Sequence, residues 1–328
     1  MNRSSKRIGG LLAALAIMYV PVPAHAQDAW PTKPVRWIVP YSAGGLPDTI
    51  ARIVAQKVSE SLGQQVTVEN RGGAGGIPGS EAVARAAPDG YTFLVADVGQ
   101  VSINQFLYAK LPYDPVKDFV PVGLIATANL FLVANAGVPV KDFGELVALA
   151  KAKPGQLNYG SSGMGSIHHL ATESLKGALG LSIVHIPYKG TGQSVPALVA
   201  GDVTMAYSAM PSIAAHVKAG RVKVLAVSTA QRSPTAPDVP TVAELGVPGY
   251  DFAPNIGLVA PAGTPAAIVA RMSQEIAKAV KSPEVAQRFA QLDIVPVGST
   301  PSEYAARIRA ASEKYAQAVK VSGARLDN

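Results

Sequence analysis

The 328-residue sequence predicts an α/β protein made of two lobes. Short apolar runs suited to buried strands alternate with longer stretches whose apolar residues recur at helical spacing. This alternation occurs twice, over residues 35–96 and 130–227, and further helices follow at the C-terminal end. Glycine-rich loops stand directly after several of the strands, at the edge where open α/β sheets bind ligands.

The N-terminal residues predict export. The chain starts with three cations and no acid, and residues 8–20 are apolar but too few to span a bilayer comfortably. Ala24-His25-Ala26 matches the small-x-small pattern of signal peptidase cleavage. We therefore expect a signal peptide over residues 1–26 and a mature chain in the periplasm that begins at Gln27. A permanent N-terminal anchor is the alternative.

Composition excludes several classes of function. The chain has no cysteine, which rules out disulfides, thiolate metal sites and a lipid anchor on cysteine. Its net charge is +7, and removal of the three leader cations leaves +4, with no basic stripe of the kind that nucleic-acid binding requires. The five histidines show no zinc-ligand spacing, so we expect no metal and no cofactor.

The first repeat of the pattern reads β-α-β-α-β, which is typical of a parallel sheet. Ile50, Ile53, Val54 and Val58 recur at helical spacing, and Pro88-Asp89-Gly90 is a turn signal. The predicted strands cover residues 35–39, 65–69 and 92–96, and the predicted helices cover residues 47–61 and 80–87.

The second repeat and the C-terminal end supply the remaining predicted elements. We expect strands at 130–134, 157–159, 183–186, 203–207, 224–227 and 256–259. We expect helices at 143–153, 167–179, 194–200, 212–219, 265–280, 282–291 and 301–321. The predicted division places lobe 1 at residues 27–128, lobe 2 at 129–251, and a return to lobe 1 at 252–328.

The loop after the first strand is a candidate anion site. Gly44 and Gly45 let a ligand approach the backbone closely, and Pro47 suits the first turn of the following helix. The free N–H groups and the positive dipole end of that helix favour an anion. A tight turn without any ligand is the alternative.

A second loop holds five glycines between Gly72 and Gly79. It is no P-loop, because no Gly-Lys-Ser/Thr follows, and it lacks the glycine register of a dinucleotide site. The loop after a later strand, Gly160 to His169, resembles the first loop in position, and its backbone amides and serine hydroxyls suit carboxylate oxygens. Tyr188 follows another strand and could stack on or hydrogen-bond a ligand, whereas we expect Lys189 to be solvated.

Ser162 and His168 raise the alternative of a secreted serine hydrolase. The G-x-S-x-G pattern of a nucleophile elbow is absent, because Met164 stands at its last position. We expect His168 to be a structural hydrogen-bond partner or a contact made on lobe closure, and we expect the protein not to be an enzyme.

Beyond these loops, a series of short motifs runs along almost the whole mature chain. They are Trp30-Pro31-Thr32-Lys33-Pro34, Ala43-Gly44-Gly45-x-x-Asp48, Glu69-Asn70-Arg71, Pro88-Asp89-Gly90-Tyr91-Thr92, Leu111-Pro112-Tyr113-Asp114-Pro115, Gly163-x-Gly165-Ser166-x-His168, Pro187-Tyr188-Lys189-Gly190, Pro237-Asp238-Val239-Pro240-Thr241 and Ala260-Pro261-Ala262-Gly263-Thr264-Pro265. In this order and spacing the chain resembles the Bug/TctC family, the extracytoplasmic solute-binding receptors of tripartite tricarboxylate transporters.

The resemblance implies a two-lobed, type II-like periplasmic binding protein, a "Venus flytrap" with its ligand cleft between the lobes. It implies that one carboxylate of a small mono- or dicarboxylate, aromatic acids included, is held near the Ser42–Gly45 loop, the adjacent helix N-terminus and Ala74. The other end of the ligand would meet the second lobe, and ordered waters would help. The expected partner is a membrane permease, with a sensor kinase as the alternative, and we expect a monomer.

The expected ligand-binding residues lie at the ends of strands in both lobes. They are Tyr41, Ser42, Ala43, Gly44, Gly45, Asp48, Ala74, Asp97, Ser161, Ser162, Gly163, Gly165, Ser166, His168, Tyr188, Thr191 and Ser208. The sequence departs from the family pattern at Tyr41, Leu46 and, above all, Asn255, where the family usually has an aromatic residue. We expect these differences to bear on which carboxylate is bound.

Overall fold

A computed structural model describes Met1 and residues 30–322 of the chain. The predicted signal peptide, residues 1–26, lies outside the described residues apart from Met1. Residues 31–322 belong to one compact unit. None of the helices in the described ranges has the length and apolar character needed to cross a lipid bilayer.

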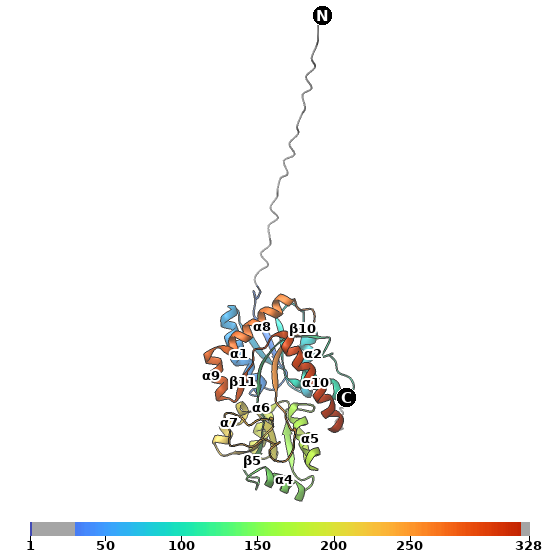
Figure 1. The fold of residues 1–328 in the computed structure, drawn as a ribbon, viewed down its shortest axis with the longest axis vertical. Coiled ribbons are helices and arrows are strands. Elements are labelled where there is room, and N and C mark those ends of the chain that lie inside the picture. Colours follow the sequence, from blue (N-terminus) through green and yellow to red (C-terminus); the bar gives the residue numbers. More distant parts are fainter. Residues whose placement is uncertain (2–29, 323–328) are drawn as a thin grey trace. The chain divides into compact units, whose positions relative to one another are not determined.

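Two separate β-sheets organise this unit, as Figure 1 shows. The larger sheet has six strands in the order β11-β4-β10-β3-β1-β2. Its strands are β1 (Val35–Val39), β2 (Val66–Asn70), β3 (Thr92–Ala96), β4 (Phe119–Ala128), β10 (Asn255–Pro261) and β11 (Ile294–Pro296). Strands β2, β1 and β3 are parallel, whereas β10 runs antiparallel to both β3 and β4.

The smaller sheet has five strands in the order β7-β6-β8-β5-β9. Its strands are β5 (Phe131–Asn135), β6 (Asn158–Ser161), β7 (Val184–Pro187), β8 (Met205–Ser208) and β9 (Val222–Val227). Strands β7, β6 and β8 are parallel, and β5 pairs antiparallel with β8 and β9. The parallel pairing predicted for the first repeat is confirmed, because β1 pairs in parallel with both β2 and β3. The antiparallel strands β10 and β5 nevertheless make both sheets mixed.

Helices flank both sheets (Figure 1). They are α1 (Leu46–Leu62), α2 (Ile77–Ala84), α3 (Asn104–Leu107), α4 (Phe143–Ala152), α5 (Ile167–Leu179), α6 (Thr191–Ala200), α7 (Met210–Lys218), α8 (Ala266–Lys281), α9 (Pro283–Gln291) and α10 (Pro301–Ser322). The predicted periodicities place most of them within a few residues. Helix α2 begins at Ile77 instead of residue 80, with Pro78 in its first turn, where a missing N–H costs little.

The sequence reading missed three features of the larger lobe. Strand β4 contains Pro121 and Gly123, which are uncommon inside strands, so the sequence did not predict it. Its residues Val122 and Leu124 are fully buried. Strand β11 has only three residues. Between β3 and β4 a π-helical turn (Gly99–Ile103) runs into α3.

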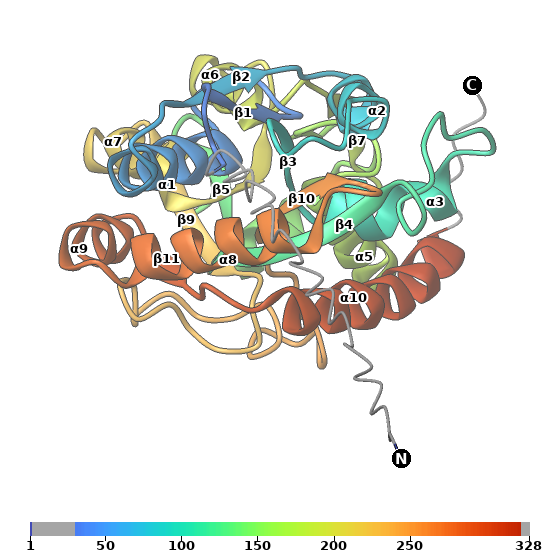
Figure 2. The ribbon, with the colours of Figure 1, turned by 90° about the horizontal axis from the view of Figure 1, so that it is seen from above.

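Each sheet has its own hydrophobic core, which makes the unit two-lobed. In the larger lobe Ile38, Leu94 and Leu124 pack in one cluster, and in the smaller lobe Phe131 and Leu198 belong to another. Helix α10 packs on β4 of the larger lobe and on α5 of the smaller one (Figure 2).

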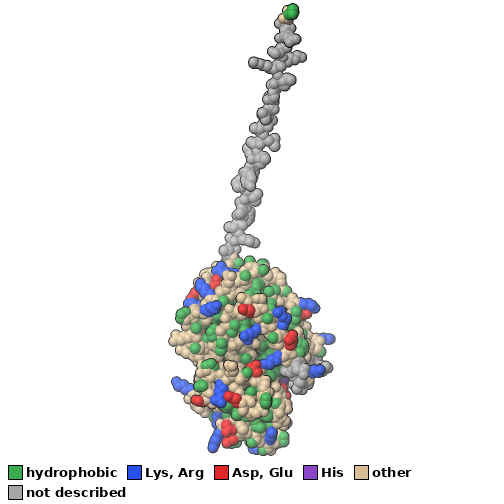
Figure 3. Space-filling view, in the orientation of Figure 1, with side chains coloured by type: hydrophobic (Ala, Val, Ile, Leu, Met, Phe, Trp, Pro, Cys, Tyr) green, Lys and Arg blue, Asp and Glu red, His purple; other side chains and the backbone are tan. Residues whose placement is uncertain are grey.

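The chain changes sheet between β4 and β5 and again between β9 and β10. The predicted lobe division after residues 128 and 251 stays a prediction. In the space-filling view, basic and acidic side chains are scattered over the described part of the face shown and form no continuous basic stripe (Figure 3).

Candidate functional site

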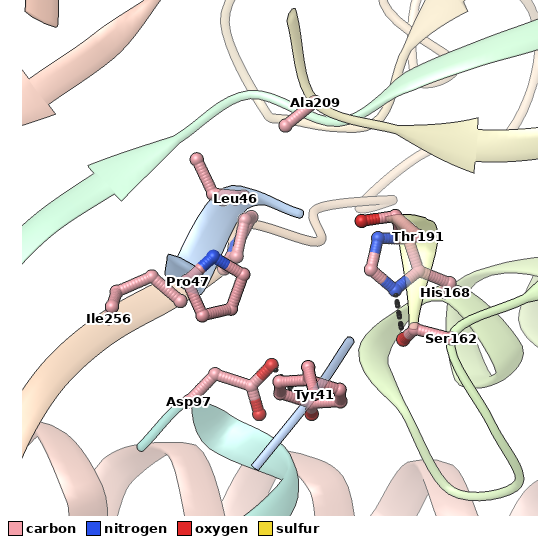
Figure 4. A pocket seen from close by; sticks show the side chains of 10 residues that line it. Tyr41, Leu46, Pro47, Asp97, Ser162, His168, Thr191, Ala209 and Ile256 are labelled. Atoms are coloured by element: carbon pink, nitrogen blue, oxygen red, sulfur yellow. Dashed lines mark hydrogen bonds between the residues drawn. The ribbon is translucent and has the colours of Figure 1, made fainter. Parts of the chain in front are cut away.

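A pocket lies where the carboxyl ends of parallel strands from both sheets meet. Strand β1 lies between β2 and β3 in the larger sheet, and β6 lies between β7 and β8 in the smaller one, so both sheets present a topological switch point. The pocket contains about 340 Å³ of space between its lining atoms, part of it open to solvent. It is lined by Tyr41, Leu46, Pro47, Asp97, Ser162, His168, Thr191, Ala209, Pro254 and Ile256 (Figure 4).

The N-terminal ends of four helices reach this pocket. Leu46 is the first residue of α1, His168 lies in the first turn of α5, Thr191 begins α6, and Ala209 is the N-cap of α7. Each helix directs free N–H groups and the positive end of its dipole toward its N-terminus. The ten lining residues include no Lys or Arg, so within the described lining an anion would meet helix N-termini and no cationic side chain of these two types.

Asp97 follows β3 and is held by a closed hydrogen-bond network. Its Oδ1 accepts from the Gly99 N–H at 2.6 Å, and its Oδ2 accepts from the Tyr41 hydroxyl at 2.9 Å. Gln100 completes the network, because its Nε2 donates to the Tyr41 hydroxyl and its Oε1 accepts from the Asp97 N–H. Burial raises the pKa of Asp97 to about 6, although the bonds from Gly99 and Tyr41 oppose the shift.

On the opposite wall, Ser162 and His168 form a buried pair. The Ser162 Oγ lies 2.7 Å from the His168 Nδ1 (Figure 4). Burial lowers the pKa of His168 to about 4, so its imidazole is neutral at pH 7. Within residues 30–322, no carboxylate is hydrogen-bonded to His168, so the third member of a Ser-His-acid triad is missing there.

The two lobes touch along a seam beside the pocket. The Ser42 N–H donates to the Lys189 carbonyl oxygen at 3.1 Å, and the Ser212 hydroxyl donates to the Gly44 carbonyl oxygen at 3.3 Å. Gly192 of α6 lies so close to the Ala43 carbonyl oxygen that a Cβ there would overlap it. The two lobes are therefore in direct contact beside the pocket.

Asp48 stabilises the loop between β1 and α1 through hydrogen bonds. Its carboxylate accepts from the Gly44 N–H at 2.9 Å, from Arg52 Nε at 3.0 Å and from Asn70 Nδ2 at 2.9 Å. Burial alone would raise the pKa of Asp48, but the bonds from these three donors outweigh it and hold the pKa below its usual value. Gly44 adopts a left-handed φ of 82°, which a residue with a side chain would resist.

The structure separates the expected binding residues into three groups. The pocket itself is lined by Tyr41, Asp97, Ser162, His168 and Thr191. The seam between the lobes contains Ser42, Ala43, Gly44, Gly45, Gly163 and Gly165. The remaining six do not line the described pocket and are Asp48, Ala74, Ser161, Ser166, Tyr188 and Ser208.

Most of this last group makes other contacts. Ser161 hydrogen-bonds to His185 at 2.6 Å, behind the pocket wall, and Ser166 caps α5 by accepting from the His169 N–H. Tyr188 packs against the core of the smaller lobe. Ala74 is exposed at a left-handed turn. Ser208 is fully buried at the end of β8.

Three apolar lining residues, Ala209, Pro254 and Ile256, were not predicted from the sequence. They supply no reactive group, so no chemical signal marked them. Leu46 and Pro47 also line the pocket, and the sequence marked them only as a departure from the family pattern and as a helix-start residue. Ala209 directly follows β8, and the strand-end rule would have found it had polarity not been required.

Asn255 does not line this pocket. It borders two grooves beside Arg307 and Ala311 of α10, while its neighbour Ile256 faces the pocket. Successive residues of a strand point to opposite faces, which explains the difference. The position at which we expected a bearing on ligand identity therefore lies outside the described pocket, whereas its neighbour Ile256 lines it.

Comparisons with known proteins agree with this architecture. Residues 50–323 match the family model described as "Tripartite tricarboxylate transporter family receptor". The chain is 36% identical to the protein BugT of Bordetella pertussis over 97% of both chains. Two solved structures are similar over their whole length. One, from R. palustris with adipate, has a TM-score of 0.88, 34% identity and 90% coverage of this chain. The other is MatC from Rhodopseudomonas palustris with bound malate, with a TM-score of 0.84, 32% identity and 88% coverage.

These comparisons point to one family. The family model matches most of the chain, a Bug relative aligns nearly end to end, and two solved structures have the same fold. The chain belongs to the Bug/TctC family of periplasmic solute-binding receptors.

Proposed function

We propose that this receptor binds a small carboxylate by closing its two lobes around it. The observation that supports this best is the convergence of four helix N-termini on one pocket without any Lys or Arg in its described lining. Backbone N–H groups and helix dipoles bind anions without a cationic side chain. Closure would trap the ligand, because the closed state makes more contacts with it.

A thermal-shift screen with carboxylates and their matched methyl esters tests this proposal. The ester removes the charge of the acid and adds one methyl group, so we expect only the acid to bind at the helix N-termini. We expect at least one acid to raise the melting temperature and its ester to leave it unchanged. Equal shifts with acid and ester, or no shift with any acid, would contradict the proposal.

We also propose that the protein is exported with cleavage after Ala26 and hands its ligand to the membrane permease of a tripartite tricarboxylate-type transporter. N-terminal sequencing of the protein recovered from the periplasm should give Gln27 as the first residue. Crosslinking to the permease subunits should strengthen when the ligand is present. An uncleaved N-terminus would indicate a membrane anchor, and ligand-independent or absent crosslinking would contradict the partner.

A further inference from the structure

Asp97 is the one acidic side chain in the described lining of the pocket, and its position is fixed. It is 3% exposed, and its hydrogen bonds with Gly99, Tyr41 and Gln100 fix the carboxylate in the pocket lining. Figure 4 shows Asp97 beside Tyr41 in this lining. Each carboxylate oxygen offers two lone-pair directions, and each accepts one hydrogen bond from the protein. Acceptor capacity is therefore left for a donor that arrives with a ligand.

The charge of Asp97 has no counter-ion in the described residues. Within residues 30–322 the hydrogen bonds that oppose the effect of burial on its pKa come from the Gly99 N–H and the Tyr41 hydroxyl and not from a cation, and His168 in the same pocket lining is neutral at pH 7. A buried carboxylate without a cation is costly unless hydrogen bonds or a ligand compensate it. The helix N-termini of the same pocket favour an anionic group, whereas an anion placed beside the Asp97 carboxylate would be repelled.

We propose that Asp97 makes this receptor selective for acids that carry one carboxylate and, away from it, an N–H or O–H donor, and that it disfavours plain dicarboxylates. This inference rests on the proposed carboxylate function and specifies its substrate class. The carboxylate of the ligand would lie at the helix N-termini, and its hydroxyl or ammonium group would donate to Asp97. The two solved relatives were obtained with dicarboxylates, adipate and malate, so this selectivity would set the chain apart from them.

Calorimetric titration with two matched series at pH 7.5 tests the proposal. The first series is butyrate, 4-hydroxybutyrate, 4-aminobutyrate and succinate, in which only the end group changes. The second is benzoate, 4-hydroxybenzoate, 4-aminomethylbenzoate and terephthalate. In the series that fits the pocket, we expect the hydroxy or amino acid to bind at least ten-fold more tightly than the dicarboxylate.

The variant Asp97→Asn identifies the residue responsible. It keeps the shape of the side chain and removes its charge. The affinity for the dicarboxylate should therefore rise and the affinity for the amino acid should fall. The ratio of these two affinities, the selectivity gap, should shrink at least five-fold. Asp97→Ser is a second neutral variant, for use if the asparagine substitution perturbs folding. Asp238→Asn removes the same charge from an exposed turn and should leave the gap unchanged.

Three results would overturn the proposal. A dicarboxylate that binds as tightly as the matched hydroxy or amino acid would remove the selectivity. A preference that persists unchanged in both neutral variants would assign it to another group. Absence of binding by every compound to every variant would overturn the carboxylate site itself, and this inference with it.

Discussion

Two buried titratable side chains line the same pocket, and burial shifts their pKa values in opposite directions. Burial raises the pKa of Asp97 to about 6 and lowers that of His168 to about 4. The folded state thus favours the neutral form of both. Asp97 contributes stability at low pH that is lost as the pH rises through 6, whereas His168 reduces stability as the pH falls from 6.5 toward 4. In the wild type these two dependences oppose each other.

Replacing Asp97 by Asn should expose this compensation. As the pH rises from 4 to 7, the wild type loses the stability that protonated Asp97 contributes, whereas Asp97→Asn has no such group. The free energy of unfolding of the variant minus that of the wild type should therefore increase over this range by as much as about 3 kcal/mol. Urea unfolding at a series of pH values measures the difference, with Asp238→Asn as the control for an exposed charge. A difference that stays constant across this range would show that Asp97 titrates normally.

Ser161 and Ser162 provide a test of which hydroxyl meets the ligand. They are adjacent, but Ser162 lines the pocket while Ser161 hydrogen-bonds to His185. Ser162→Ala should weaken binding of the ligand found by the thermal-shift screen about five-fold to ten-fold, the worth of about one hydrogen bond. Ser161→Ala should change it less than two-fold in the same titration. Equal losses in both variants would contradict the placement of the pocket wall.

At the scale of elements, glycines let the lobes approach each other. Gly192 lies in the first turn of α6 and directly against the Ala43 carbonyl oxygen of the other lobe. Its backbone is helical, so an alanine fits the helix itself and is favoured there by about 0.5 to 1 kcal/mol. Only the contact between the lobes forbids a side chain at this position.

The variant Gly192→Ala should therefore fold normally but close poorly. We expect ligand affinity to fall at least ten-fold while the free energy of unfolding without ligand is unchanged or higher. Gly177→Ala in α5 is the matched control, because a Cβ there meets no atom within 4 Å. Calorimetry and urea unfolding measure the two quantities. Wild-type affinity in Gly192→Ala would show that closure does not bring these segments together.

Helix α4 illustrates an element that serves stability alone. Asp142 caps it by accepting from the Glu145 N–H at 2.9 Å, and Glu145 accepts in return from the Lys141 N–H at 2.7 Å. Asp142→Ala should lower the free energy of unfolding by about 1 kcal/mol, and Asp142→Asn should retain most of it. Ligand affinity should not change, because no residue of α4 lines the described pocket. A loss of affinity would reveal coupling between this helix and the site.

At the scale of the whole molecule, two cores joined by two crossings allow the lobes to move as bodies. Beside the pocket the lobes meet through a few hydrogen bonds and glycine contacts, and helix α10 also packs on both lobes. Binding should hence shift an open population toward the closed one.

Small-angle scattering should detect this shift as a smaller radius of gyration when the ligand is added. At a ligand concentration of one hundred times Kd, the free energy of unfolding should also rise by about 2.7 kcal/mol. At the same concentration Gly192→Ala, with at least ten-fold weaker binding, should gain no more than about 1.4 kcal/mol and should contract less than wild type. An unchanged radius of gyration in wild type, with binding proven by calorimetry, would mean that the free receptor is already closed.

Local signals in the sequence were sufficient for most of the elements. Helix α5 was predicted at its observed bounds, because a serine cap, a helical apolar period and a terminal glycine all act within one segment. Strands β1 and β3 were likewise predicted at their observed bounds from short apolar runs. The loops that follow β1, β3, β6 and β7 were singled out for the same reason, since residue type and strand ends are both local properties.

The sequence by itself thus determined the α/β class and the alternation of strands and helices, which occurs twice along the chain. It also determined the strand ends that are followed by Tyr41, Asp97, Ser162 and Thr191. Only the tertiary structure decided that the sheets are mixed and that Asp48 stabilises a loop instead of lining the pocket. It also decided that Ile256, and not Asn255, lines the pocket. These properties depend on which distant strands pair and on which face of β10 meets each lobe. Such non-local contacts leave no periodic signal within one segment, because each arises from two parts of the chain that meet only after folding.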